Sequence, residues 1–140
     1  MTEPLLEAVN LTKELGSGAG KVAALKGVSL ALNGGELTLL MGPSGSGKTT
    51  LLSILGCMLT PTEGTVRVCR HSTTGLDPEE LARLRREHVG FVFQSFHLFP
   101  TLSTTDNVRR ALDVRGERSR PAKVRSREAL AKVGLAHKIK

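Results

Sequence analysis

Residues 37–50 read LTLLMGPSGSGKTT, and the fold assignment depends on this stretch. LTLLM (37–41) is a short apolar run of the kind that a strand buried on both faces shows. GPSGSGKT (42–49) fits the pattern G-x-x-x-x-G-K-[ST] at every fixed position. Apolar residues then recur at helical spacing between Leu51 and Met58. The sequence therefore predicts a strand, a glycine-rich loop and a helix in direct succession, which is the setting of a phosphate-binding P-loop.

The loop residues predict a site for a nucleoside triphosphate. Glycines let successive backbone N–H groups point inward around an anion, and the helix N-terminus adds a favourable dipole. We expect Lys48 to reach the β- and γ-phosphates, the Thr49 hydroxyl to ligate Mg²⁺, and Thr50 to add a further phosphate contact. The expected binding residues are Gly42, Pro43, Ser44, Gly45, Ser46, Gly47, Lys48, Thr49 and Thr50. The alternative is a glycine turn that binds nothing, which the complete pattern in this context disfavours.

The segments on either side of the loop predict an α/β protein. Residues 5–11 and 22–32 carry short apolar runs around a glycine-rich stretch, which predicts two antiparallel strands. Asp77 is expected to cap a helix because Pro78 follows it directly and Glu80 stands at the capping spacing. The other expected elements are a strand over 65–69, a helix over 78–87, a strand over 89–93, a helix that begins after Ser103 or Thr104, and a helix over 121–133 that ends at Gly134.

Gln94 is the second candidate functional residue. It follows the predicted strand 89–93 and precedes SFHLFPTLSTTDNV, an apolar loop with aromatic residues that leads to a helix start. A glutamine that leaves a buried strand near a P-loop can ligate Mg²⁺ or orient the attacking water. Taken alone, it can equally be an ordinary polar residue at a strand end. A P-loop by itself does not separate kinases, GTPases and transport ATPases.

Three stretches together resemble the ATP-binding cassette (ABC) family, in its lipoprotein-release and macrolide-export branch. They are ALKGVSLALNGGELTLLMGPSGSGKTTLLSILG, TPTEGTV and LRREHVGFVFQSFHLFPTLSTTDNV. The resemblance extends from about Leu5 to Lys140. It implies that Gln94 is the Q-loop glutamine, which touches the metal and links the nucleotide site to a membrane subunit. It also implies that residues 95–101 form the surface on which a coupling helix of that subunit rests.

The resemblance implies the fold, the ligands and the partners. The fold would be an incomplete P-loop NTPase with a RecA-like core: residues 1–94 would form an antiparallel β part and the P-loop core, and residues 95–140 the Q-loop and the start of a helical subdomain. The ligands would be ATP and Mg²⁺, with the metal at Thr49 and Gln94 and with Gln94 in the catalytic role. The partners would be a transmembrane permease subunit and a second ATPase subunit, in a homodimer. The protein would then lie in the cytoplasm, on the inner face of the plasma membrane.

Two departures from the family pattern limit what the chain is expected to do. Leu15 or a neighbour stands where family members stack an aromatic residue on adenine, and leucine has no π-face. The family's signature motif, its Walker B strand ending in Asp-Glu and its switch histidine do not occur in the 140 residues. LNGGE (32–36) superficially resembles the signature, but it precedes the P-loop and is interpreted as a turn. Because hydrolysis needs a base or a water-positioning carboxylate, this chain alone is expected to be inactive or nearly so.

The same comparison with the family pattern predicts a structural weakness. Two strands that lie between the P-loop strand and the Gln94 strand in the family belong to its downstream half. Without them the sheet would have a central gap and unpaired edges. We therefore expect weak stability and a tendency to aggregate.

Charge and composition bound the remaining alternatives. Residues 1–66 hold four Lys/Arg and five Asp/Glu, whereas residues 67–140 hold 16 and eight, so the net charge of +7 comes from the second part. Such asymmetry fits nucleic acid, an anionic membrane surface or a solvated helical face. The stretch 109–127 has no aromatic residue on which a base could stack, so no nucleic-acid partner is expected. Cys57 and Cys69 are expected to be free thiols.

Three functions follow in order of preference: an ABC transport ATPase subunit, a nucleotide-binding module without hydrolysis, and a basic nucleic-acid-binding protein that carries a P-loop. The N-terminal MTEPLLEAVN does not have the pattern of a secretory signal. No run of about 18 apolar residues occurs, so a membrane partner would have to hold the protein at a membrane.

Overall fold

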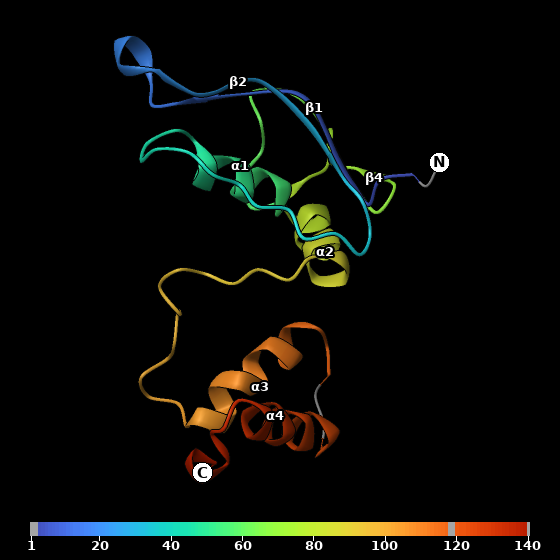
Figure 1. Cartoon of the computed structure of the whole chain (residues 1–140), viewed down its shortest axis with the longest axis vertical. Coiled ribbons are helices and arrows are strands. Elements are labelled where there is room, and N and C mark those ends of the chain that lie inside the picture. The colour runs from blue at the N-terminus through green and yellow to red at the C-terminus, as the bar shows by residue number, and fades with distance from the viewer. Residues whose placement is uncertain (1–2, 118–119, 140) are drawn as a thin grey trace. The chain divides into compact units, whose positions relative to one another are not determined.

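The computed structural model describes residues 3–117 and 120–139. The chain divides into two compact units, Met1–Gly90 and Phe91–Lys140. In chain order the elements are β1 (Leu6–Leu15), η1 (Gly18–Gly20), β2 (Val22–Leu32), α1 (Lys48–Leu55), β3 (Glu63–Val68), β4 (His71–Ser72), α2 (Pro78–His88), α3 (Thr104–Val114), α4 (Arg120–Lys132) and η2 (Ala136–Lys138), as Figure 1 shows. The boundary at residue 94 implied by the family resemblance stays a prediction.

The first unit contains a four-stranded antiparallel sheet in the order β2-β1-β3-β4. β1 lies between its partners, so that Leu6 pairs with Leu32 on one side and with Val68 on the other. At Gly64 the backbone of β3 approaches β1 so closely that a Cβ atom would lie 2.4 Å from the carbonyl oxygen of Asn10. The antiparallel start predicted from the sequence is confirmed, and so is the strand predicted over 65–69.

The core of this unit lies between the sheet and two helices, α1 and α2, which lie on the same side of it in Figure 1. α1 contributes Leu51, Ile54 and Leu55, whose spacing puts them on one helix face. α2 contributes Leu81 and Leu84 in the same way. The sheet residues in this core are Ala8, Leu11, Leu25, Val66 and Val68.

The helix ends follow the predicted capping chemistry. The Asp77 side chain accepts hydrogen bonds from the backbone N–H groups of Glu79 and Glu80, both at 2.8 Å, and the Glu80 carboxylate accepts one from the backbone N–H of Asp77. Of the two predicted caps of α3, Ser103 is the one that accepts from the backbone, at the N–H of Asp106. The chain leaves α4 through Gly134, at a positive φ of 77°. The predicted helices are confirmed.

Two predicted strands are wrong. Residues 37–41 and 89–93 are extended coil, and Leu37, Met41 and Val92 expose 100%, 77% and 95% of their surface. A strand forms only where a neighbour takes up its backbone N–H and C=O groups. Within the described residues no backbone hydrogen bond joins residues 37–41 or 90–93 to another segment. The backbone groups of these two segments are thus left without partners among the described residues.

The second unit is a pair of packed helices, α3 and α4, followed by η2. The face of α4 that is buried consists of Ala122, Ser126 and Leu130, spaced four residues apart. Small residues dominate this face, and the Ser126 hydroxyl donates to the carbonyl of Ala122 at 2.8 Å, so its burial leaves no free polar group. Thr105 of α3 is also buried.

Candidate functional site

The predicted P-loop lies where the sequence placed it, directly before α1. Gly47 is the N-cap of α1 in a left-handed conformation, with φ at 86°, and Gly45 has φ at 77°. Both values favour glycine over any residue with a side chain. The buried face of α1 holds the helix against the sheet, so the loop is fixed at its C-terminal end. Its N-terminal end continues from the exposed segment 37–41.

A side chain at position 47 would also collide with neighbouring atoms. A Cβ atom there would lie 2.3 Å from the carbonyl oxygen of Ala24 and 3.0 Å from a methyl carbon of Leu25. Both neighbours belong to β2, so the loop passes directly against the sheet. At Gly42 a Cβ atom would lie 2.9 Å from Oγ of Ser46, on the opposite arm of the loop. The backbone of Ala24 is fixed in β2, so the close approach requires glycine at position 47, whereas the Ser46 hydroxyl can rotate away from a side chain at position 42.

Lys48 is held by the loop that precedes it. Its Nζ donates to the backbone carbonyls of Gly42 at 2.8 Å and Pro43 at 2.6 Å, and to Oγ of Ser46 at 3.3 Å. The ammonium group therefore lies over the loop, close to its backbone. A mobile cation in this place can neutralise a phosphate that the loop receives.

The donor groups of the loop fit a phosphate. In the part of the chain that the structure describes, the backbone N–H groups of Gly45, Gly47, Lys48, Thr49 and Thr50 have no hydrogen-bond acceptor. Such groups at a helix N-terminus are donors that an anion can satisfy. Thr49 is exposed, and its hydroxyl is a hard oxygen ligand of the type that Mg²⁺ takes. The residues present thus fit a nucleotide phosphate with its magnesium ion.

Gln94 belongs to the second unit and is exposed in a turn, not at the end of a strand. The structure does not place it relative to Thr49, so their shared metal site stays a prediction. The residues after it are also exposed, with Phe96 at 82%, Leu98 at 68% and Phe99 at 54%. Phe96 and His97 have positive φ values of 22° and 49°, which is unusual for residues with side chains. This segment presents apolar side chains outward.

Asn107 organises the end of this segment and was missed in the sequence analysis. Its Oδ1 accepts from the backbone N–H of Phe99 at 2.8 Å, and its Nδ2 donates to the carbonyls of Phe99, Leu102 and Ser103, each at 3.1 Å. The side chain thereby ties the loop to the first turns of α3. A signal was present, since an asparagine early in a helix that follows a loop can bond the backbone before it.

The two cysteines are free thiols, as predicted. Burial raises the pKa of the Cys57 thiol, and the nearby positive charge of Arg85 opposes this shift. Cys57 is therefore a neutral thiol at physiological pH. Among the described residues no group of three His, Cys, Asp or Glu side chains is arranged to hold a metal ion.

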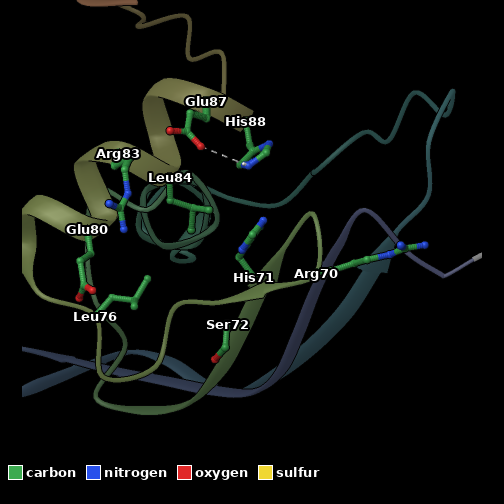
Figure 2. Close-up of a pocket in the computed structure, with 9 residues that line it drawn as sticks. All are labelled: Arg70, His71, Ser72, Leu76, Glu80, Arg83, Leu84, Glu87 and His88. Carbon is green, nitrogen blue, oxygen red and sulfur yellow. Dashed lines mark ion pairs between the residues drawn. The ribbon is translucent and has the colours of Figure 1, made fainter.

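A cavity of about 360 Å³ opens between β4 and α2 in the first unit (Figure 2). His71 and His88 stack across it with ring centroids 5.3 Å apart, and Glu87 lies 3.9 Å from His88. The arginines at its rim are balanced by glutamates, of which Glu80 is already engaged in the capping box of α2. The cavity thus offers no excess charge to a ligand, and no binding role is assigned to it.

Leu15, the residue near the expected adenine position, ends β1 and exposes 43% of its surface. It pairs with Val22 of β2 across the hairpin. The structure thus has an apolar side chain available at this place, and no aromatic ring.

The antiparallel sheet, the glycine-rich loop and the helix that it caps define part of a P-loop NTPase of the α/β class. Residues 25–140 match the family model "ABC transporter". The chain belongs to the ABC transporter family and is part of an ATP-binding domain of that family. The expectation drawn from the sequence motifs is therefore confirmed at the level of family and fold.

The relatives agree on the branch of the family. The chain is 43% identical over 135 residues to "Macrolide export ATP-binding/permease protein MacB" of Salmonella choleraesuis, covering 96% of this chain and 21% of that protein. The MacB protein of Burkholderia thailandensis is 43% identical over 136 residues, again with 21% of its length covered. The macrolide-export and lipoprotein-release branch inferred from the sequence is consistent with these matches.

Solved structures of an ABC cassette have the same fold. A dimeric, post-hydrolysis state of the ATP-binding cassette MJ0796 with ADP and Pi superposes with a TM-score of 0.83 at 40% identity, covering 90% of this chain and 56% of that one. A second dimeric structure of MJ0796, described as a bacterial ABC transporter cassette, gives 0.82 at 40% identity. The chain thus spans about a fifth of the MacB proteins and 56% of the cassette.

In residues 3–117 and 120–139 no helix is both long and apolar enough to span a bilayer.

Proposed function

We propose that the chain belongs to the ATP-binding subunit of an ABC transporter that couples ATP binding and hydrolysis to export or extraction of a substrate. The observation that carries this proposal is the complete P-loop at the start of α1, with its unsatisfied backbone N–H groups and with Lys48 over the loop. Membership of the ABC transporter family supports ATP as the nucleotide that this loop binds. The nucleotide would be held by residues 42–50.

The roles of individual residues follow from their chemistry. Lys48 would leave the carbonyls of Gly42 and Pro43 and bind the β- and γ-phosphates, while the backbone N–H groups of the loop bind their oxygens. Thr49 would hold Mg²⁺ and Thr50 would add a phosphate contact. Gln94 would complete the metal site and orient water for the reaction. The bound Mg²⁺ would neutralise charge on the phosphates.

The membrane partner would bind at residues 95–101. This segment exposes Phe96, Leu98 and Phe99, and an exposed apolar cluster of this kind marks a surface for another protein. The partner would be a permease subunit, which would hold the protein at the inner face of the plasma membrane. A second copy of the ATPase is supported by the dimeric MJ0796 structures. Relatives named for macrolide export support a lipophilic substrate, either a drug-like molecule or a lipoprotein.

The alternative is a module that binds nucleotide without hydrolysing it. It is favoured by one observation: residues 42–50 offer groups that bind a phosphate, and none of their side chains is a base or a carboxylate that could position water. Groups of this kind position water, so that a P-loop without them can bind but does not cleave.

Affinity for ATP and turnover should be measured in the same protein sample. We expect binding of Mg²⁺-ATP that weakens when Mg²⁺ is removed, with little or no turnover by this chain alone. Hydrolysis that appears only when this chain is mixed with a complete cassette whose own P-loop lysine has been replaced would favour the transport ATPase over the isolated module. A chain that binds no nucleotide under any of these conditions would contradict both.

A further inference from the structure

The charge of the protein is concentrated in its second unit. Residues 1–90 hold nine Lys/Arg and nine Asp/Glu, whereas residues 91–140 hold 11 and four. The whole net charge of +7 therefore belongs to the 50 residues that contain α3 and α4. A positive charge concentrated in one unit attracts anionic partners to that unit.

Three of these positive charges lie along one side of α4. The helix packs through Ala122, Ser126 and Leu130, so its other sides face solvent. Arg120, Lys123 and Arg127 stand at positions i, i+3 and i+7, which places them along one exposed side of the helix, and we call them the α4 basic stripe. Val124, half exposed at 51%, lies within the same side because it is four residues after Arg120 and three before Arg127.

The α4 basic stripe makes no ion pair that would stabilise the second unit, among the residues that the structure describes. Among the described residues, the ion pairs of the second unit join Arg109 and Arg110 to Asp113, and Arg125 to Glu117, and none includes a member of the stripe. The first turn of α4 contains no acidic residue. Cations in a first turn oppose the helix dipole, so Arg120 and Lys123 lower the stability of the helix that carries them.

We propose that the α4 basic stripe binds the anionic headgroups of a lipid bilayer. Three long cationic side chains along one helix side can each reach a headgroup phosphate, and each basic side chain near an anionic lipid surface adds to the attraction. Val124 between them supplies a small apolar surface that can enter the headgroup region. A single-stranded nucleic acid fits less well, because the stripe has no aromatic side chain on which a base could stack.

The inference goes beyond the proposed function, because it needs neither nucleotide nor permease. It would give the module its own attachment to the membrane surface, in addition to any contact through residues 95–101. It is also independent of the P-loop assignment, since the binding can be measured without nucleotide.

Flotation of the whole chain with lipid vesicles in a density gradient tests the proposal. Vesicles rich in phosphatidylglycerol are compared with vesicles of pure phosphatidylcholine, at low and high salt, and aggregated protein sinks while bound protein floats. We expect flotation with the anionic vesicles only, weakening as salt rises. Flotation with both kinds of vesicle, or with neither, would overturn the proposal.

Two matched variants locate the binding surface. The stripe variant carries Arg120→Gln, Lys123→Gln and Arg127→Gln, and the control carries Lys26→Gln, Arg83→Gln and Arg86→Gln in the first unit, so both lose three positive charges. We expect the stripe variant to bind anionic vesicles roughly 10- to 100-fold less strongly than the natural chain, and the control to bind about as well as it. Equal loss in both variants would show attraction by net charge alone and would refute the assignment to α4. Far-UV circular dichroism confirms that α4 still forms in each variant, and salt-sensitive binding to a DNA duplex without vesicle binding would make nucleic acid the partner instead.

Discussion

At the scale of single residues, the P-loop depends on glycines for two separable reasons. Gly45 and Gly47 share a positive φ, but only Gly47 also faces a neighbour, the carbonyl oxygen of Ala24, at 2.3 Å from the position a Cβ would take. Around Gly45 no atom lies within 4 Å of that position. The two positions therefore form a matched pair for separating backbone strain from steric exclusion.

We predict that Gly47→Ala disturbs β2 and that Gly45→Ala does not. Both substitutions introduce strain of about 1 kcal/mol, but only the first must also push Ala24 away. Hydrogen exchange measured by mass spectrometry should show the amides of residues 22–26 exchanging roughly 5- to 100-fold faster in Gly47→Ala than in Gly45→Ala. Equal exchange in the two variants would mean that the close approach to β2 is not a constraint on the loop.

At the scale of elements, residues close in the sequence determine whether a helix or hairpin forms, whereas a buried strand forms only if distant segments pair with it. The capping box of α2 could be foreseen because Asp77, Pro78 and Glu80 act within one turn. Whether residues 37–41 form a strand could not be predicted from nearby residues. The apolar pattern of this segment requires neighbours on both sides, and within the described residues none pairs with it.

The local motif of the candidate site could be predicted from the sequence, but its contacts with distant residues could not. The P-loop is a local motif, so residues 42–50 were found by pattern alone, and the structure adds the contacts of Lys48 and Gly47 that no pattern shows. Asn107 was missed because its four hydrogen bonds to the preceding loop depend on how that loop folds back on α3. The place of Gln94 beside the metal involves both units and stays a prediction.

We predict that Asp77→Ala loosens α2. The substitution removes two backbone hydrogen bonds at 2.8 Å, and loss of such a cap costs about 1 kcal/mol. Amide exchange of peptides covering residues 78–88 should therefore become roughly fivefold faster. Asp77→Asn, which keeps an oxygen acceptor, should remain close to the natural chain. If alanine and asparagine behave alike, the side-chain cap contributes nothing to this helix.

At the scale of the whole molecule, we expect the exposed apolar segments to lower the stability of the chain. Leu37, Leu39 and Val92 expose between 78% and 100% of their surface, and they lie in the two segments that were expected to be buried strands. Unpaired backbone next to apolar side chains favours association with other chains. The core between the sheet, α1 and α2 is correspondingly small.

We predict that the isolated 140-residue chain tends to aggregate and shows no single cooperative unfolding transition. Calorimetry combined with light scattering after size exclusion measures both properties. Leu37→Thr together with Leu39→Thr should raise the monomeric fraction, whereas Leu51→Thr, in the core, should lower it. A monomeric natural chain with one sharp thermal transition would contradict the prediction of weak stability.

Titration of Mg²⁺-ATP into the natural chain, the Lys48→Ala variant and a Lys26→Ala control tests most directly whether residues 42–50 bind the nucleotide. Among the described residues, Lys48 is the one whose charged group bonds to the loop, while Lys26 is an exposed cation of β2. We expect the natural chain and the Lys26→Ala control to bind with similar affinity and Lys48→Ala to show no measurable binding. Unchanged affinity in Lys48→Ala would contradict the assignment of the nucleotide site.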